Sequence, residues 1–409
     1  MKVKPPKGDW KVGLSRLSLG SMESPGLYLH VPFCSAICPY CDFAVRVGRR
    51  EKRIRFVDTL LSEIGREAGT RPGFAGAGID TIYLGGGTPS ILDREDLERI
   101  LAAVRRAFAP RPDAQIFLEA NPEDVGARSL AAWRRLDVSF LSLGVQSFDR
   151  RDLAFLGRRH TPAEARRSVE LALGAGFETV SVDLIYGLPH HDLAAWRRTL
   201  EQAVNLGPQH LSCYELEIHR RTTFGKRRAR GELEELPEAE QAELFLATHR
   251  LLRERGYRGY EVSNFARAPA GGPPAHESRH NRKYWRHVPY LGLGPSAHSF
   301  DGRRRWWNER LLPRWEKKVR RGEPGTEGSE VLDDRQLALE TLMLGLRTAR
   351  GVDLERFRRR FGYDLVERHR ARVERLVEEE RLRLAGGRLV PTLEGLAVAD
   401  AIAASLADA

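Results

Sequence analysis

The chain of 409 residues is 41% hydrophobic and 30% charged, and its formal net charge is +11. No segment approaches the roughly 18 consecutive apolar residues of a membrane-spanning helix, and four cysteines are too few for a scaffold held by disulfides. The basic excess favours anionic ligands, but most of the arginines stand beside acidic residues in expected helices, which is typical of a solvated surface.

Residues 1–25 are expected to form a flexible N-terminal extension. They are basic and contain Gly, Pro and Ser, without the apolar core of a secretory signal, which predicts a cytoplasmic protein. Because the first strand-like run begins at Gly26, Met22 is an alternative start, and residues 1–21 would then not belong to the native chain.

Residues 26–263 alternate between β-rich runs and amphipathic helical patterns. The β-rich runs are 26–33, 79–85, 115–120, 138–145, 180–185 and 210–217, and the helical patterns between and after them are 54–67, 94–108, 162–175, 193–205 and 238–255. This alternation predicts right-handed βαβ units and a parallel sheet. Six units predict an α/β fold, an open, partial (β/α)6 barrel of TIM type, because a closed barrel needs eight.

Polar and glycine-rich residues follow the β-rich runs. They lie at 34–41, 85–89, 119–123, 146 and 187–189. The carboxyl ends of the strands of an α/β barrel form one rim, where active sites are built. One rim is therefore expected to collect every motif.

The last third of the chain has a different pattern. Residues 264–330 are expected to form a loop and connecting region that carries the sequence HNRKYW at 280–285. Residues 331–409 are mainly helical in pattern, and two apolar runs around Gly386 and Gly387 predict a β-hairpin. We therefore expect a winged-helix-like C-terminal domain. Such domains can bind nucleic acid, but no residues are arranged for reading bases, and no specific nucleic-acid partner is expected.

Three of the four cysteines, Cys34, Cys38 and Cys41, have the spacing C-x3-C-x2-C. Structural zinc usually has four protein ligands, and His30 is a candidate fourth ligand. The tight turn suits a [4Fe–4S] cluster better, because three thiolates leave one of four irons open to a small molecule. Cys213, inside the sixth β-rich run, is expected to be an inert buried thiol.

These motifs resemble the radical S-adenosylmethionine (SAM) superfamily. The likeness includes the aromatic Tyr40 before the last cysteine and extends over nearly the whole chain. It is strongest to the oxygen-independent coproporphyrinogen III oxidase group, and within that group to the HemW family of haem chaperones. The segments that carry it are YLHVPFCSAICPYCDF, YLGGGTPS, LEANPE, SLGVQSF, DLIYGLP, SRHNRKYW and LGLGPSAHSF.

The resemblance implies that the three cysteines hold a [4Fe–4S] cluster whose open iron binds the amino and carboxylate groups of SAM. It places a glycine-rich run at the methionyl amino end of SAM, where glycines let the backbone approach a ligand. It also implies an Arg for the SAM carboxylate, an Asp for the ribose hydroxyls and further residues near the site. The implied SAM-site residues are Tyr28, Tyr40, Gly85, Gly86, Gly87, Thr88, Glu119, Gln146, Arg158 and Asp183.

Two functions fit this group. In the oxidase, SAM is cleaved reductively, and the resulting radical abstracts hydrogen from a propionate of coproporphyrinogen III before decarboxylation. Where the oxidase has Gly and a fourth Cys, this chain has Asp42 and Phe43, which is the chaperone pattern. The resemblance therefore favours a chaperone that carries haem as cargo, with the oxidase as the alternative. Whether SAM is cleaved, and hence whether the chain is an enzyme, stays open.

The segment SRHNRKYW resembles the HNxxYW segment of HemW proteins, which implies that His280 is an axial haem ligand, with His298 as the next candidate. Tyr284 and Trp285 would pack on the macrocycle, and Arg279 or Arg282 would meet its propionates. The expected partners are haem-requiring client proteins such as membrane respiratory enzymes, and an electron donor such as flavodoxin or ferredoxin. Peripheral contact with the inner face of the membrane is a further expectation.

Overall fold

The computed structural model describes residues 23–269, 272 and 275–407. The extension predicted for residues 1–25 therefore lies outside the described residues except for its last three. The alternative start at Met22 also lies outside them.

A curved sheet of twelve strands forms the body of the protein, in the order β14-β13-β12-β11-β1-β4-β5-β6-β7-β8-β10-β9. Its centre consists of six parallel strands, which confirm the six predicted β-rich runs. They are β1 (Gly26–Val31), β4 (Thr81–Gly86), β5 (Gln115–Ala120), β6 (Val138–Gln146), β7 (Thr179–Tyr186) and β8 (His210–Glu215). Since β14 and β9 are edges, the sheet is an open partial barrel, as predicted.

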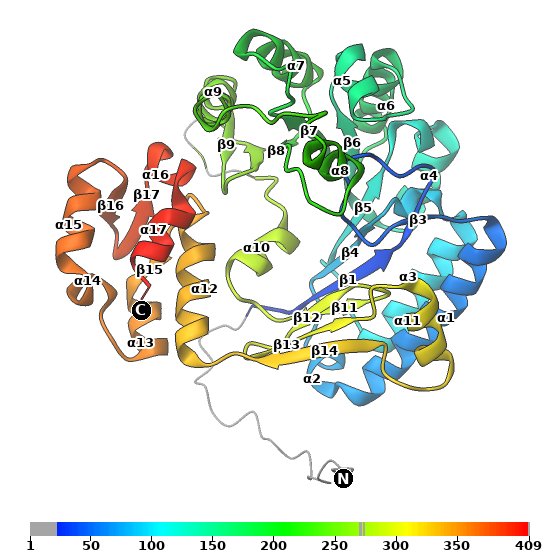
Figure 1. Cartoon of the computed structure of the whole chain (residues 1–409). Coiled ribbons are helices and arrows are strands. Elements are labelled where there is room, and N and C mark those ends of the chain that lie inside the picture. The colour runs from blue at the N-terminus through cyan, green and yellow to red at the C-terminus, as the bar shows by residue number, and fades with distance from the viewer. Residues whose placement is uncertain (1–22, 270–271, 273–274, 408–409) are drawn as a thin grey trace.

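Helices cover the outer, convex face of the sheet (Figure 1). The larger ones are α1 (Arg50–Thr70), α3 (Arg94–Phe108), α4 (Ala127–Arg135), α6 (Pro162–Gly174), α7 (Leu193–Leu206) and α9 (Glu238–Glu254). Local signals explain their ends: Thr161 and Glu164 form a capping box at the start of α6, and α7 stops at Gly207, whose φ is 77°. Shorter elements are α2 (Pro72–Ala75), α5 (Arg150–Phe155), α8 (Thr223–Ala229) and the strand pair β2 (Phe33–Cys34) and β3 (Arg46–Val47).

Alternation along the central strands separates the core from the site. In β1, Leu27, Leu29 and Val31 belong to the large apolar cluster shared with the helices, whereas Tyr28 and His30 line an interior cavity. Successive side chains of a strand point to opposite faces, so each strand contributes both to the apolar core and to the cavity wall. Cys213 belongs to the helix-facing core, where it is 2% exposed, and burial raises the pKa of its thiol. It is the buried thiol that was predicted.

Residues 264–330 differ from the expected loop and connecting region. Beyond β8 the sheet continues with β10 (Asn264–Arg267), which also pairs with β9 (Tyr257–Gly259), a strand just before this region. Beyond β1 it continues with β11 (Tyr290–Leu293), β12 (His298–Phe300), β13 (Arg304–Asn308) and β14 (Thr326–Val331), and α11 (Leu312–Arg320) joins the last two. Most of these strands have only three to five residues, which is too short for alternation to distinguish a strand from a loop.

The segment HNRKYW lies in α10 (Arg279–Trp285), inside the curve of the sheet (Figure 1). Two of its basic residues bind Asp80, which precedes β4: Lys283 Nζ lies 2.5 Å from one carboxylate oxygen and Arg279 Nη2 3.1 Å from the other. Because Asp80 stands at the amino end of a parallel strand, α10 closes the end of the barrel opposite the predicted rim.

The C-terminal domain is mainly helical with a small sheet, as predicted. Its helices are α12 (Asp334–Leu346), α13 (Leu354–Phe361), α14 (Leu365–Arg368), α15 (Arg370–Glu378), α16 (Leu393–Ala397) and α17 (Ala399–Ser405). Its strands are β15 (Val352–Asp353), β16 (Leu382–Ala385) and β17 (Arg388–Pro391). The last two form the predicted hairpin, turning at Gly386 and Gly387, whose φ angles are 56° and 71°. A separate apolar cluster forms its core.

Across the described ranges, we find no helix with both the length and the hydrophobicity that crossing a bilayer requires.

Candidate cofactor site at the carboxyl ends of the strands

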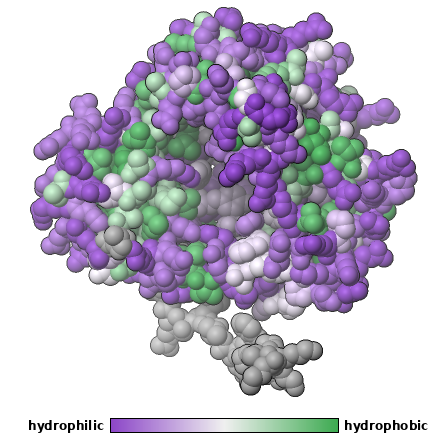
Figure 2. Space-filling view, in the orientation of Figure 1, coloured by the Kyte–Doolittle hydropathy of each residue, from purple (hydrophilic) through white to green (hydrophobic). Residues whose placement is uncertain are grey.

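A cavity of about 800 Å³ lies inside the curve of the sheet, toward the carboxyl ends of its strands. Figure 2 shows a hollow at the centre of this face, with hydrophobic residues on parts of its rim and hydrophilic residues over most of the remaining surface. The volume lies in the range of small-molecule and cofactor sites. Among the residues proposed from the sequence, the cavity brings together Tyr28, Cys34, Cys38, Tyr40, Cys41, Gly86, Gly87, Thr88, Glu119, Gln146, Arg158 and Asp183. Gly85 and His280 are not on its wall.

The cysteine loop begins at β2, which ends with Cys34, and turns so that the Cys41 N–H donates to the Cys38 carbonyl at 3.1 Å. Two side chains reach its sulfurs: Thr88 Oγ1 lies 3.5 Å from Cys34 Sγ, and Arg158 Nη1 lies 3.4 Å from Cys38 Sγ. Burial raises the pKa of Cys34 to about 11, against the opposing effect of the Thr88 hydroxyl. A bound cation that replaces the proton would therefore hold this residue as a thiolate.

The spread of the cysteines distinguishes the two metal alternatives. Ligands of one tetrahedral zinc lie about 3.8 Å apart when all are sulfur. Among the described residues, Asp152, His190 and His191 form the one group of three potential ligands whose ligand atoms all lie within 4.8 Å of one another. The three cysteine sulfurs do not all lie within 4.8 Å of one another. Their arrangement therefore fits a multi-iron cluster better than a single zinc ion.

His30, the alternative fourth ligand, has both ring nitrogens occupied. Its Nε2–H donates to the Ala44 carbonyl at 3.1 Å, so Nδ1 accepts from the Tyr28 hydroxyl at 3.1 Å. Burial lowers its pKa to about 4, which favours this neutral form. His30 therefore fastens the segment after the cysteines to β1. From α8, Phe224 supports the same loop, since its N–H donates to the Pro39 carbonyl at 2.9 Å and its ring lies 6.5 Å from that of Tyr40.

The glycine run at the end of β4 is joined to the cysteine loop by backbone hydrogen bonds. The N–H groups of Gly87 and Thr88 donate to the carbonyls of Val31 and Phe33, each at 2.8 Å. Gly86 has a φ of 104°, and a Cβ there would overlap the ring of His30. Glycine is therefore required at Gly86 by the packing of the protein alone. This requirement is independent of any contact with a ligand.

Two of the carboxylates on the cavity wall are residues that the sequence analysis singled out. Glu119 accepts from the Tyr83 hydroxyl at 2.7 Å and from the Gly86 N–H at 3.1 Å, and burial together with Asp183 raises its pKa to about 7. Asp183 accepts from the Ser142 hydroxyl at 3.0 Å, and burial raises its pKa to about 6. Carboxyl groups that titrate near neutral pH inside a cavity are typical of functional sites.

Arg158 connects several parts of the site. Its Nη2 donates to Asn121 Oδ1 at 2.6 Å and to the Gly144 carbonyl at 2.9 Å, whereas its buried Nε makes no hydrogen bond within the described part of the chain. Gln146 ends β6 with a φ of 70°, at an irregularity in the pairing with β7. Such a backbone is uncommon for a residue other than glycine and is often found at functional sites.

Sequence reasoning missed three residues that hold the predicted ones in place, namely Tyr83, Asn121 and Ser142. They bond Glu119, Arg158 and Asp183 respectively. A usable signal exists in the strands: small or polar residues at every second position, such as Ser142, Gly144 and Gln146 in β6, mark the face that lines the cavity.

His280 lies away from the cavity. Its side chain is 0% exposed, Nδ1 is hydrogen-bonded to Thr81 Oγ1 at 2.9 Å, and Nε2 is hydrogen-bonded to the Tyr284 hydroxyl at 2.8 Å. As an axial haem ligand it would have to leave both bonds and the interior, so this arrangement does not support the expected role. Arg279 and Arg282 are likewise ion-paired, with Asp80 and Glu277. His298 of β12, in contrast, is exposed and lines the cavity.

Comparison with known proteins agrees with this geometry. Residues 28–203 match the Radical SAM superfamily, and residues 332–398 match the HemN C-terminal domain. The haem chaperone HemW of a Synechocystis species is 37% identical over 339 residues, which cover 80% of this chain and 78% of that protein. The haem chaperone HemW of Bacillus subtilis is 32% identical over 340 residues, which cover 83% and 87%.

Among solved structures, the coproporphyrinogen III oxidase HemN of Escherichia coli superposes with a TM-score of 0.80 over 94% of this chain and 90% of the other, at 22% identity. That likeness shows a shared fold. The HemW relatives match most of this chain at 32–37% identity, and two family models match it as well, so a more specific conclusion follows. The chain belongs to the HemW family of the radical SAM superfamily.

Proposed function

We propose that this chain is a haem chaperone that holds a [4Fe–4S] cluster and SAM in its cavity and transfers haem to haem-requiring proteins. The observation that supports it most is the convergence of Cys34, Cys38 and Cys41 with the SAM-site positions on one cavity wall. When bound, the cluster supplies an electron and an iron with one open position, which SAM can occupy.

The residues of the chain would bind and orient SAM. Arg158, which already lies 3.4 Å from Cys38 Sγ, would meet the SAM carboxylate beside the cluster. Gly86, Gly87 and Thr88 would meet the amino end, with Gly85 behind them. Glu119 adds a carboxylate that is bonded to the Gly86 N–H, and Asp183 would accept from the ribose hydroxyls. Tyr28, Tyr40 and Gln146 complete the walls.

We assign the haem-binding histidine to His298 in preference to His280. Its ring stacks on Trp307 with a centroid distance of 5.9 Å, and its side chain is exposed at the cavity, where an iron and a client protein can both reach it. Phe43, 69% exposed on the same cavity wall, offers apolar surface to a porphyrin. The clients would include membrane respiratory enzymes, reached by a cytoplasmic protein that contacts the membrane peripherally, and flavodoxin or ferredoxin would donate electrons.

Haem titration of anaerobically reconstituted protein tests the assignment. Wild-type protein should bind one haem per chain with a shifted haem absorption band, and His298→Ala should weaken binding by more than about tenfold, as expected when an iron ligand is lost. His280→Ala should keep haem affinity, although the loss of two buried hydrogen bonds lowers its thermal stability. His219→Ala, which removes another exposed cavity histidine, should change neither quantity. Haem binding that survives His298→Ala and fails in His280→Ala would reverse the assignment.

Two further measurements test the family function itself. Electron paramagnetic resonance of the reduced protein should show a [4Fe–4S] signal that changes when SAM is added. An anaerobic assay with SAM, a reductant and coproporphyrinogen III should give no decarboxylation. A product with two vinyl groups would instead establish the oxidase alternative.

A further inference from the structure

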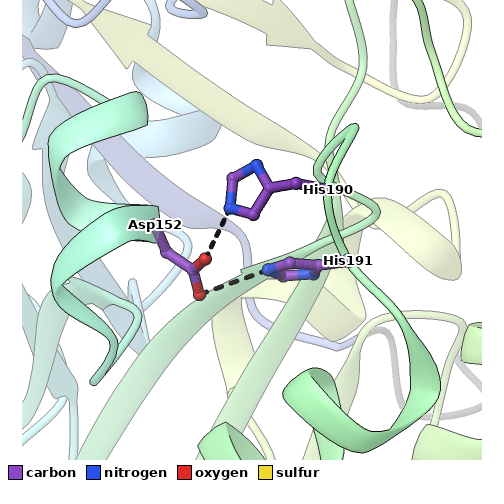
Figure 3. Close-up of side chains that lie close together, drawn as sticks. All are labelled: Asp152, His190 and His191. Atoms are coloured by element: carbon purple, nitrogen blue, oxygen red, sulfur yellow. Dashed lines mark hydrogen bonds and ion pairs between the residues drawn. The ribbon is translucent and has the colours of Figure 1, made fainter.

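A second group of potential metal ligands lies outside the cavity. Asp152 belongs to α5, and His190 and His191 lie in the loop after β7, where the sequence reads GLPHHD. Figure 3 shows both imidazoles directed at the carboxylate of Asp152 from one loop. His190 Nε2 lies 2.9 Å from Asp152 Oδ1, and His191 Nε2 lies 3.2 Å from Asp152 Oδ2. None of the three residues lines the cofactor cavity.

These distances are close to those between two ligands of one small divalent ion. Zinc binds imidazole nitrogen and carboxylate oxygen at about 2.0–2.2 Å in a tetrahedron, which puts neighbouring ligand atoms about 3.4 Å apart. All three ligand atoms of the group already lie within 4.8 Å of one another. The three side chains therefore already gather around one point, and an ion could enter once they adjust to its coordination distances.

His191 supplies an independent observation that points to a ligand. Its side chain is 1% exposed, and within the described ranges neither Nδ1 nor Nε2 makes a hydrogen bond. The contact of Nε2 with Asp152 at 3.2 Å is an ion-pair contact without hydrogen-bond geometry. A buried imidazole nitrogen without a well-directed hydrogen bond is costly, and a metal ion on Nε2 would replace its poorly directed contact with Asp152.

The surroundings hold the group in a fixed orientation. The Ser147 hydroxyl donates to Asp152 Oδ2 at 2.7 Å and accepts from the Asp149 N–H at 3.0 Å. The ring of His190 contacts Phe155 edge-on at 5.4 Å, and that of His191 stacks on Trp196 at 6.3 Å. Such outer contacts orient the ligands of metal sites. The side chain of His190 is 15% exposed, so the group is accessible from solvent.

We propose that Asp152, His190 and His191 bind a divalent transition-metal cation of the zinc class, with water in the fourth position. Two imidazoles and one carboxylate select this class over Mg²⁺ and Ca²⁺, which prefer oxygen ligands. The ion would join α5 to the loop after β7. Since the Arg158 N–H donates to the Leu153 carbonyl of α5 at 2.8 Å, it would also stabilise the segment that positions Arg158 in the cavity.

Zinc itself is the probe, and the cysteines must not compete for it. In the full-length chain with its cluster reconstituted, calorimetry should detect one Zn²⁺ site. In a full-length Cys34→Ala/Cys38→Ala/Cys41→Ala variant, Co²⁺ should give the visible bands of a tetrahedral nitrogen–oxygen site without a thiolate charge-transfer band. Absence of a Zn²⁺ site from the reconstituted protein would overturn the proposal.

Variants assign the ligands. Asp152→Asn and His191→Gln should each weaken Zn²⁺ binding by more than about tenfold, and Zn²⁺ should raise the unfolding temperature of the wild type but not theirs. Because both residues are buried, the half-buried His190→Gln provides a milder variant with the same expected loss. His219→Gln is the matched control: it removes an exposed histidine 3.5 Å from a single carboxylate, that of Glu217, and should leave binding unchanged. Wild-type affinity in the His190→Gln/His191→Gln double variant would refute the assignment.

Discussion

Gly87 shows how a single residue links the two loops of the cofactor site. A Cβ at this position would lie 2.6 Å from the Phe33 carbonyl oxygen and 2.8 Å from that of Val31, both backbone atoms that cannot turn away. These are also the carbonyls that accept from Gly87 and Thr88. A methyl group here must therefore separate the glycine run from the cysteine loop that begins at Cys34.

Gly87→Ala is predicted to destabilise the protein by about 1–3 kcal/mol, the usual cost of overpacking, and to lower iron and sulfide content after reconstitution. The matched control is Gly65→Ala in α1, where an added Cβ meets nothing within 4 Å. That change should stabilise the helix by about 0.5–1 kcal/mol and leave the iron content unchanged. Thermal unfolding and iron analysis measure both quantities, and full iron content in Gly87→Ala would contradict the explanation.

At the scale of elements, one carboxylate on α1 connects three segments that are distant in sequence. Glu63 is 1% exposed, and it accepts from the Gly294 N–H at 2.6 Å, from Asn308 Nδ2 at 2.9 Å and from Trp315 Nε1 at 3.0 Å. It thereby joins α1 to the end of β11, to β13 and to α11. Burial raises its pKa to about 7, although the N–H groups of Gly294 and Trp315 oppose the shift.

This shift predicts a dependence of stability on pH. The folded protein holds the Glu63 proton more tightly than the unfolded chain, whose glutamate has a pKa of 4.5. The contribution of Glu63 to the free energy of unfolding should therefore be largest below pH 4.5, decrease by up to about 3 kcal/mol as the pH rises to about 7, and stay level above that.

Glu63→Gln should remove this part of the pH dependence. It should also lower stability by about 1–3 kcal/mol, because the amide NH₂ would face a donor and leave a buried group unpaired. Denaturant unfolding between pH 4.5 and 8 checks both effects, with Glu51→Gln on the exposed first turn of α1 as the control. If the free energy of unfolding of Glu63→Gln depends on pH as it does in the wild type, the raised pKa of Glu63 is not the cause of that dependence.

At the scale of the whole molecule, the C-terminal domain lies on the open side of the barrel and contacts both ends of the sheet (Figure 1). Near the β9–β10 edge, the Val262 N–H donates to the Arg347 carbonyl, and the Ala349 N–H donates to the Tyr260 carbonyl, each at 3.1 Å. Near the other edge, Glu340 of α12 accepts from Arg305 of β13 at 2.6 Å and from His287 at 3.1 Å. The domain therefore completes a wall that six βα units leave open.

Glu340→Gln is predicted to loosen this attachment. Burial tends to raise the pKa of Glu340, but the bonds from His287 and Arg305 outweigh it and lower the pKa to about 2. The contribution of this carboxylate is therefore present above pH 4.5 and lost as the pH falls toward 2. Its side chain is 24% exposed, so removal of the charge should cost only about 1 kcal/mol.

Amide hydrogen exchange at neutral pH measures that loosening. Exchange in residues 334–346 should accelerate in Glu340→Gln, whereas Glu330→Gln, which removes the exposed partner of Arg305 within the sheet, should leave it unchanged. Equal exchange in the two variants would show that Glu340 does not hold the domain.

The sequence by itself determined the six parallel strands, their helices, the hairpin and the loops of the cofactor site. Strand periodicity, capping residues and glycines act over a few consecutive residues. They can therefore be recognised without knowing which distant segments lie beside them in the fold. The tertiary structure decided what depends on distant contacts. The strands of residues 257–331 exist because they pair with the two edges of the central parallel strands. His280 is buried because Thr81, 199 positions away, lies beside it. The group of Asp152, His190 and His191 likewise forms only where α5 meets the loop after β7, since spacing along the chain does not encode which loops become neighbours.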